Sequence, residues 1–233
     1  MSKKLSTLTA RAGTLVKQQV RYTGWNSDLN AFVAKRLETP RPTKVRTIEW
    51  LSMDPRLGEE FTLLDIGCGP GVFAQMLRAS RLSERVRYTG VDQSEQAVAH
   101  ARETLPDTYS FVIRDVLREG LPRESYDVIA INEVVEHMPN YRDLLAAALA
   151  KKPRVLVVTT FAVLPEQKKD RFLWNKRYSC YMNTYAFGDF YQYLRERSGG
   201  PIQVVDFGTE TDETAEFPQK ALILFYLPAP TAG

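Results

Sequence analysis

An apolar run that ends in an acid and three closely spaced glycines could hold a nucleotide-like ligand. Residues 63–71 read Leu-Leu-Asp-Ile-Gly-Cys-Gly-Pro-Gly, and apolar residues recur at helical spacing over 72–77. A glycine turn between a strand and a helix lets a ligand approach the backbone closely. A dinucleotide-binding G-x-G-x-x-G pattern would require glycine where Val72 stands. Asp65 puts a carboxylate at the strand end, where it would repel a pyrophosphate and could receive an ammonium group.

This segment resembles the first motif of class I S-adenosylmethionine-dependent methyltransferases, in which the acid and the glycine loop hold the methionyl part of the cofactor. The resemblance implies S-adenosylmethionine as the cofactor. It also implies that the methionyl group is held by Asp65, Gly67, Cys68, Gly69 and Gly71. The alternative is a tight strand-to-helix turn that binds no ligand, and residues further along the chain favour the cofactor site.

Acids also stand at the ends of the next two expected strands. Asp92 ends a strand over 86–92, where a carboxylate could grip a ribose diol. Asp115 follows a strand over 109–113, and the resemblance implies that it accepts a hydrogen bond from the adenine amino group while the backbone of Val116 meets the ring. Each acid alone could be an ordinary loop residue. Three acids at successive strand ends, in cofactor order, favour S-adenosylmethionine.

A second segment with chemical potential follows the fourth expected strand, 126–131. We expect Asn132, together with Gln93 after the second strand, to complete the cofactor site. If residues 133–137 take helical angles, Glu133, Glu136 and His137 share one face. Two carboxylates and an imidazole on one face could bind a divalent metal or act as an acid-base group.

The E-x-x-E-H spacing of this segment is similar to ubiquinone-biosynthesis O-methyltransferases and to small-RNA 2′-O-methyltransferases, where these side chains ligate metal. The RNA enzymes add a further histidine, but the only other histidine here is His100, which we expect to be solvated on the helix after Asp92. We therefore expect no metal. The remaining interpretations are a segment that packs beside the cofactor, and a metal-free site in which His137 is a general base assisted by Glu133 or Glu136.

Composition places the chain among ordinary globular proteins. It has 233 residues, 44% of them hydrophobic and 25% charged, which suits one soluble domain with a sizeable core. We expect a cytoplasmic protein because the sequence has neither an apolar run of membrane-span length nor a secretory signal. Cys68 and Cys180 are expected to be free thiols. A net charge of +3 makes nucleic acid an unlikely partner without excluding it.

The order of expected elements predicts an α/β fold. Alternating strands and helices indicate a seven-stranded, mostly parallel Rossmann-like sheet with helices on both faces, and the resemblance implies an antiparallel last strand. We expect residues 1–45 to form an N-terminal helical cap and 46–233 the methyltransferase domain. Helices are expected over 46–53 and 185–197.

The segment 161–184 has no clear periodicity and is expected to cover the substrate. It combines basic and aromatic residues, which suit a small molecule that is anionic, planar or glycosylated, although a solvated loop is the alternative. The sequence thus predicts methyl transfer to an oxygen of a small or medium-sized acceptor. The alternatives are an RNA 2′-O-methyltransferase and a non-catalytic scaffold of the same fold.

Overall fold

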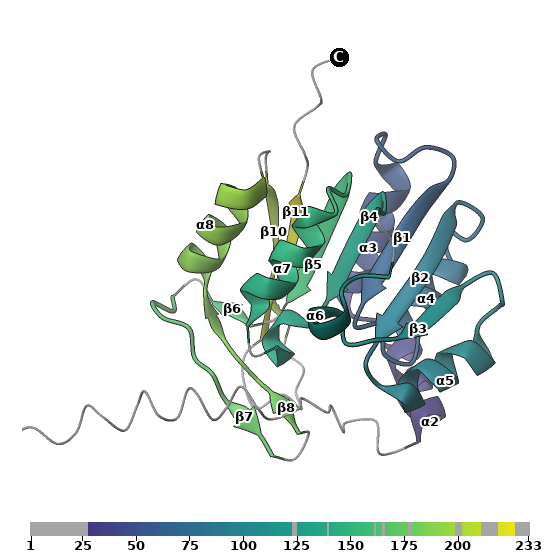
Figure 1. The fold of residues 1–233 in the computed structure, drawn as a ribbon, viewed down its shortest axis with the longest axis horizontal. Coiled ribbons are helices and arrows are strands. Elements are labelled where there is room, and N and C mark those ends of the chain that lie inside the picture. The colour runs from purple at the N-terminus through teal and green to yellow at the C-terminus, as the bar shows by residue number, and fades with distance from the viewer. Residues whose placement is uncertain are drawn as a thin grey trace, which may run out of the picture.

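One open sheet organises the chain (Figure 1). The computed structural model describes residues 28–122, 125–138, 140–160, 162–164, 166–176, 179–198, 202–210 and 219–226, with only the backbone described for 203–210 and 219–226. Residues 1–27 of the expected N-terminal cap lie outside the described residues.

The described sheet has the strand order β10-β11-β5-β4-β1-β2-β3. Its strands are β1 (Phe61–Ile66), β2 (Val86–Asp92), β3 (Ser110–Ile113), β4 (Val128–Asn132), β5 (Val155–Thr160), β10 (Ile202–Glu210) and β11 (Gln219–Tyr226). The strands β1 to β5 pair in parallel, which confirms the expected Rossmann-like core. Strand β11 pairs antiparallel with both β5 and β10. Strand order reverses at β1, which lies between β2 and β4, and ligands bind such folds at this point beyond the carboxyl ends of the strands.

Helices cover both faces of the sheet (Figure 1). One face carries α3 (Pro42–Met53), α4 (Val72–Arg78) and α5 (Glu95–Thr104), and α2 (Leu29–Glu38) contacts α4. The other face carries α6 (Val116–Glu119), α7 (Tyr141–Ala150) and α8 (Phe187–Ser198). The central strands are rich in apolar residues because both of their faces are buried, as in β5, whose six residues are all buried. Successive residues Leu63 and Leu64 therefore belong to different hydrophobic clusters.

Two expected helix boundaries were wrong. Helix α3 begins at Pro42 rather than at 46, because proline fits the first helical position, where its missing N–H costs nothing. Helix α8 begins at Phe187 rather than at 185, because Tyr185–Ala186 form β9 and pair with β6 (Val163–Leu164).

The segment 161–184 contains short strands that its sequence did not predict. Trp174–Asn175 (β7) and Cys180–Tyr181 (β8) pair antiparallel and form a hairpin that extends away from the large sheet (Figure 1). Arg171 and Thr184 form an isolated bridge at its base. None of the described helices is both long and apolar enough to cross a membrane.

Candidate active site

The three predicted acids lie at one edge of the sheet, on neighbouring strands. Asp65 near the end of β1 is opposite Gly90, and Asp92 at the end of β2 is opposite Ile113. Asp115 lies two residues after the end of β3, as the N-cap of α6. Each acid therefore stands slightly beyond the preceding one across the edge, and an extended ligand could contact all three.

The loop after β1 needs glycine for two reasons. Gly67, Gly69 and Gly71 have φ angles of 74°, 53° and 86°, in the left-handed region that favours glycine. A Cβ on Gly67 would lie 2.4 Å from Cγ2 of Val134, and one on Gly71 would lie 2.6 Å from Cδ1 of Leu105. Between them Cys68 is a buried thiol whose pKa is raised by burial. Side chains at the flanking glycines would displace this loop from the sheet edge.

Asp92 ties the glycine loop to the second strand. Its Oδ2 accepts a hydrogen bond from the Gly69 N–H at 2.9 Å, and its Oδ1 accepts one from the Ser94 N–H at 2.8 Å. Burial raises the pKa of Asp92. The backbone N–H of Gln93 also acts on this carboxylate. A carboxylate has about four acceptor positions, so Asp92 can still accept a hydrogen bond from a ligand hydroxyl. Gln93 beside it is exposed at the turn before α5.

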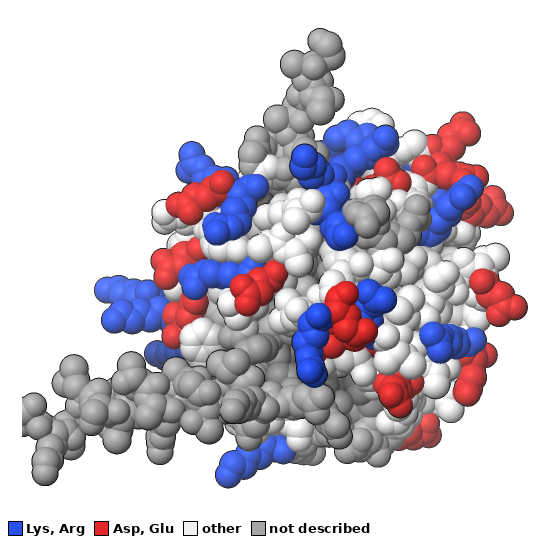
Figure 2. Space-filling model, in the orientation of Figure 1, with Lys and Arg blue, Asp and Glu red and all other residues white. Residues whose placement is uncertain are grey.

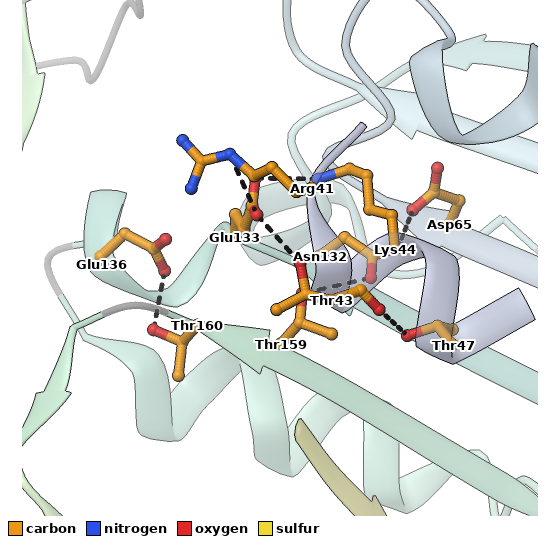
Figure 3. Close-up of polar contacts among 10 residues, drawn as sticks. All are labelled: Arg41, Thr43, Lys44, Thr47, Asp65, Asn132, Glu133, Glu136, Thr159 and Thr160. Carbon is orange, nitrogen blue, oxygen red and sulfur yellow. Dashed lines mark hydrogen bonds and ion pairs between the residues drawn. The ribbon is translucent and has the colours of Figure 1, made fainter. Parts of the chain in front are cut away.

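Asp65 is 1% exposed and lies in a chain of polar side chains that crosses the four strands β2, β1, β4 and β5. Figure 3 shows the part of this chain from Asp65 through Asn132 to Thr159. Its Oδ2 accepts a hydrogen bond from the Tyr88 hydroxyl at 2.7 Å, and its Oδ1 accepts one from Nδ2 of Asn132 at 3.3 Å. The Thr159 hydroxyl donates to Oδ1 of Asn132 at 3.2 Å, which orients the amide. Burial raises the pKa of Asp65 to about 6, and the charge of Lys44 opposes this rise. The structure thus brings Asn132 to Asp65.

Asp115 has a structural task at the start of α6. Its Oδ1 accepts a hydrogen bond from the Leu117 N–H at 3.1 Å, as the N-cap of this short helix. Val116 follows it and is buried. The cap fixes the carboxylate at the third strand end.

Glu133, Glu136 and His137 do not form the predicted helical face. Glu133 has a φ of 58°, and only Val135–His137 form a helical turn, the 3-10 helix η1. The left-handed backbone at Glu133 breaks the expected i, i+3, i+4 geometry. No group of three or more His, Cys, Asp or Glu side chains that could hold a metal ion occurs among the described residues.

Glu133 is held by the beginning of α3 (Figure 3). Lys44 Nζ lies 2.8 Å from its Oε2, and Arg41 Nε lies 3.4 Å from its Oε1. The Thr43 hydroxyl also donates to Oε1, at 3.3 Å. Burial raises the pKa of Glu133, but the charges of Lys44 and Arg41 outweigh burial and leave this pKa below its ordinary value. Glu133 is therefore an ionised partner of α3.

Glu136 has the opposite environment. It is 0% exposed, and its Oε2 accepts a hydrogen bond from the Thr160 hydroxyl at 3.2 Å (Figure 3). Its Oε1 is buried with no hydrogen-bond partner among the described residues. Burial raises the pKa of Glu136 to about 8, and the charge of Glu133 adds to the rise. Glu136 is therefore mainly protonated at neutral pH.

His137 is oriented by the hairpin of segment 161–184. Its Nδ1 lies 2.8 Å from the backbone oxygen of Tyr181 in β8. Because a carbonyl oxygen only accepts hydrogen bonds, Nδ1 must carry the hydrogen, and Nε2 holds the lone pair of the neutral ring. Burial lowers the pKa of His137, which keeps the ring neutral at pH 7. The other histidine, His100, is 9% exposed and buried on α5, so its predicted solvation was wrong.

The sequence did not identify the residues that orient the predicted ones: Arg41, Lys44, Tyr88, Thr160 and Tyr181. Tyr88 offered one signal, since a tyrosine within a buried strand needs a partner for its hydroxyl. Lys44 offered none, because its partner Glu133 is 89 positions away along the chain.

Comparison with known proteins gives matches to methyltransferases. Residues 64–151 match the family model described as a methyltransferase domain. The chain is 30% identical over 149 residues to trans-aconitate 2-methyltransferase of Escherichia coli O17:K52:H18, an alignment that covers 64% of this chain and 52% of that protein. The chain thus spans about half the length of the curated relatives it matches.

Solved structures share the fold. A similar one is the S-adenosylmethionine dependent methyltransferase of Mesorhizobium loti, with a TM-score of 0.58 and 17% identity over 81% of this chain and 99% of that chain. Another is 1,6-didemethyltoxoflavin-N1-methyltransferase of Burkholderia thailandensis, with its substrate and S-adenosylhomocysteine bound. Its TM-score is 0.59, with 16% identity over 98% of this chain and 94% of that chain.

Proposed function

We propose that this chain carries a class I S-adenosylmethionine-dependent methyltransferase domain and is an enzyme that methylates an oxygen of a small or medium-sized acceptor. The observation that carries the proposal is that Asp65, Asp92 and Asp115 lie at the carboxyl ends of three neighbouring parallel strands, next to the glycine loop. This edge is where folds of this kind bind ligands.

The three carboxylates are hydrogen-bond acceptors, which suits the ammonium, hydroxyl and amino groups of S-adenosylmethionine. Asp65 would receive the methionyl ammonium group, Asp92 the ribose diol and Asp115, with the backbone of Val116, the adenine. The loop 67–71 after β1 would border the methionyl group. Asn132 at the end of β4 and Gln93 after β2 lie on the two strands that flank β1. When bound, S-adenosylmethionine supplies a methyl group activated by its sulfonium charge. The protein's task is then to align the acceptor and to remove its proton.

His137 is the residue best suited to take a proton from a hydroxyl acceptor. The Tyr181 carbonyl fixes the tautomer, which leaves Nε2 as the basic atom. Glu133 is committed to Lys44 and Arg41, and Glu136 is mainly protonated, so neither acid replaces His137 as the base. Glu136 could instead donate a hydrogen bond from its buried carboxyl group.

We further infer that the acceptor is anionic. The curated relatives are named for trans-aconitate, a carboxylic acid. Arg41 and Lys44 are 15% and 14% exposed and bring two cations to the sheet edge, where both pair with Glu133 and the charge of Lys44 also acts on Asp65. On the face seen in Figure 2 basic and acidic side chains are interspersed, and they form no basic stripe there. The cations that would meet an anionic acceptor are therefore Arg41 and Lys44.

The test is transfer from S-adenosylmethionine labelled in its methyl group to a panel of anionic hydroxy acids and carboxylic acids that includes trans-aconitate. We expect a labelled product and an equal amount of S-adenosylhomocysteine. Replacing His137→Ala should lower kcat for a hydroxyl acceptor by about 10²-fold or more. The control is His100→Gln, which alters the other histidine outside the site and should leave kcat unchanged.

Unchanged turnover in His137→Ala would remove His137 from catalysis. It would then favour an acceptor oxygen that carries no proton, such as a carboxylate. If the protein binds S-adenosylhomocysteine but transfers no methyl group to any acceptor of the panel, the result would favour a non-catalytic scaffold of the same fold.

A further inference from the structure

A tyrosine inside the sheet acts on the first acid of the cofactor site. Tyr88 lies in β2 opposite Leu63 and before Gly90, the residue that faces Asp65 across the strands. Strand side chains lean along the strand direction, and the long Tyr88 side chain reaches Asp65 in this way. Its hydroxyl donates a hydrogen bond of 2.7 Å to Oδ2 of Asp65. Both residues are buried, at 2% and 1% exposure.

Tyr88 is fixed by its neighbours. Its ring centroid lies 5.1 Å from that of Tyr109 and 5.6 Å from that of Phe111, both in the hydrophobic cluster beneath α4 and α5. The hydroxyl position is therefore set by packing and does not depend on a mobile surface group. A hydrogen bond from a rigid donor to a carboxylate favours the charged form of that carboxylate.

Asp65 needs this support because its environment disfavours charge. Burial raises its pKa to about 6, and the hydrogen bonds from Tyr88 and Asn132 and the charge of Lys44 act in the opposite direction. The charge of Asp92 at the end of β2 adds to the rise. The buried thiol of Cys68 is a further neighbour, and its own pKa is raised mainly by burial and in part by the charges of Asp92 and Asp65. A carboxylate has about four acceptor positions, so two remain for a ligand after Tyr88 and Asn132 have each used one.

We propose that Tyr88 is a positioning residue for the cofactor: its hydroxyl aligns the Asp65 carboxylate and keeps it in the anionic form that receives an ammonium group. This inference rests on the proposed function, because it assumes that Asp65 meets the methionyl ammonium group. Tyr88 itself, inside the sheet, acts only through Asp65.

The test is the affinity for S-adenosylhomocysteine between about pH 5 and about pH 8 in wild type and Tyr88→Phe. Loss of the hydroxyl should raise the pKa of Asp65 by about one unit. The affinity of the variant should then be about tenfold below wild type at about pH 5 and within about twofold of it at about pH 8. The matched control is Tyr109→Phe, since this neighbouring hydroxyl is buried with no hydrogen-bond partner among the described residues. It should leave the pH profile unchanged.

A direct readout is the pKa of Asp65 in the ligand-free protein, followed by NMR of carboxyl-labelled aspartate and assigned with Asp65→Asn. Tyr88→Phe should raise this pKa and should have no further effect on affinity in an Asp65→Asn background. An equal loss of affinity at every pH, or no loss, would overturn the inference while leaving the proposed function intact. Wild-type protein that binds no S-adenosylhomocysteine would overturn both.

A second measurement covers the case in which Tyr88→Phe does not fold. The hydroxyl proton of Tyr88 in wild type should give a slowly exchanging NMR signal, because the group is buried and hydrogen-bonded. This signal should shift as Asp65 titrates and again when S-adenosylhomocysteine is added. A signal that responds to neither would overturn the inference.

Discussion

Glu133 and Glu136, two acids of one short segment, have opposite protonation states. The charges of Lys44 and Arg41 keep Glu133 ionised. Glu136, whose buried carboxyl group accepts a hydrogen bond from the Thr160 hydroxyl, is mainly protonated. The pattern E-x-x-E-H treats the two as equivalent. Their surroundings separate them, because an opposite charge favours a carboxylate and burial disfavours it.

Glu136 gives the folded protein a pH dependence. Its pKa is raised from 4.5 to about 8, so the folded state keeps a proton that the unfolded chain releases between these values. The stability that this group contributes is complete below the unfolded pKa and is lost as pH rises through the folded pKa. Replacing Glu136→Gln removes the titration, so the Tm of the variant relative to wild type should rise from about pH 5 to about pH 8.5, by about 2 °C or more.

The comparison is thermal unfolding by circular dichroism at several pH values. Glu49→Gln, an exposed carboxyl on α3, is the control and should show a constant difference from wild type. A Tm of Glu136→Gln that falls relative to the Tm of wild type as pH rises would mean that Glu136 is ionised in the folded protein.

At the scale of elements, helix α3 is attached to the end of β4 by charge. Lys44, Arg41 and Thr43 all contact the carboxylate of Glu133, and Leu51 at the other end of the helix packs in the core. The ion pairs therefore fix the beginning of α3 beside the proposed cofactor site. Glu133 has a left-handed backbone at this contact, a conformation that costs energy for a residue other than glycine.

Replacing Lys44→Met should lower the free energy of unfolding by about 1.5–3 kcal/mol, because it removes a charged hydrogen bond from a nearly buried carboxylate. Urea unfolding measures this change. The matched control is Arg46→Met on the same helix, whose pair with Glu49 is exposed and should contribute less than about 1 kcal/mol. Equal effects of the two substitutions would show that the contact with Glu133 does not hold α3.

The elements show how far the sequence could predict the structure. The sequence predicted a strand over 86–92, and the observed β2, Val86–Asp92, agrees with it. The start of α3 was missed because a proline can either end a helix or occupy the first position of one. The hairpin β7–β8 was missed because strands of two residues leave only a weak local pattern. The contacts of Tyr88 with Asp65 and of Lys44 with Glu133 depend on strand register and helix packing, which no local pattern contains.

At the scale of the whole molecule, the sheet gathers residues that the chain keeps apart. Asp65, Asp92 and Asp115 are separated by helices α4 and α5, yet parallel pairing brings their strand ends to one edge. The segment 161–184 returns to the same region and orients His137 through Tyr181. The fold therefore combines the proposed cofactor site and the proposed base at one end of the sheet.

We propose that this edge of the sheet binds the cofactor of a methyltransferase, and calorimetric titration of the full chain with S-adenosylhomocysteine measures that binding. We expect one molecule bound per chain, and an affinity about 10- to 100-fold weaker in Asp92→Ala, because this substitution removes the proposed charge-assisted hydrogen bonds to the ribose. Folding of both proteins is checked by circular dichroism. Absence of binding to folded wild-type protein, or equal affinity of the two proteins, would contradict the account.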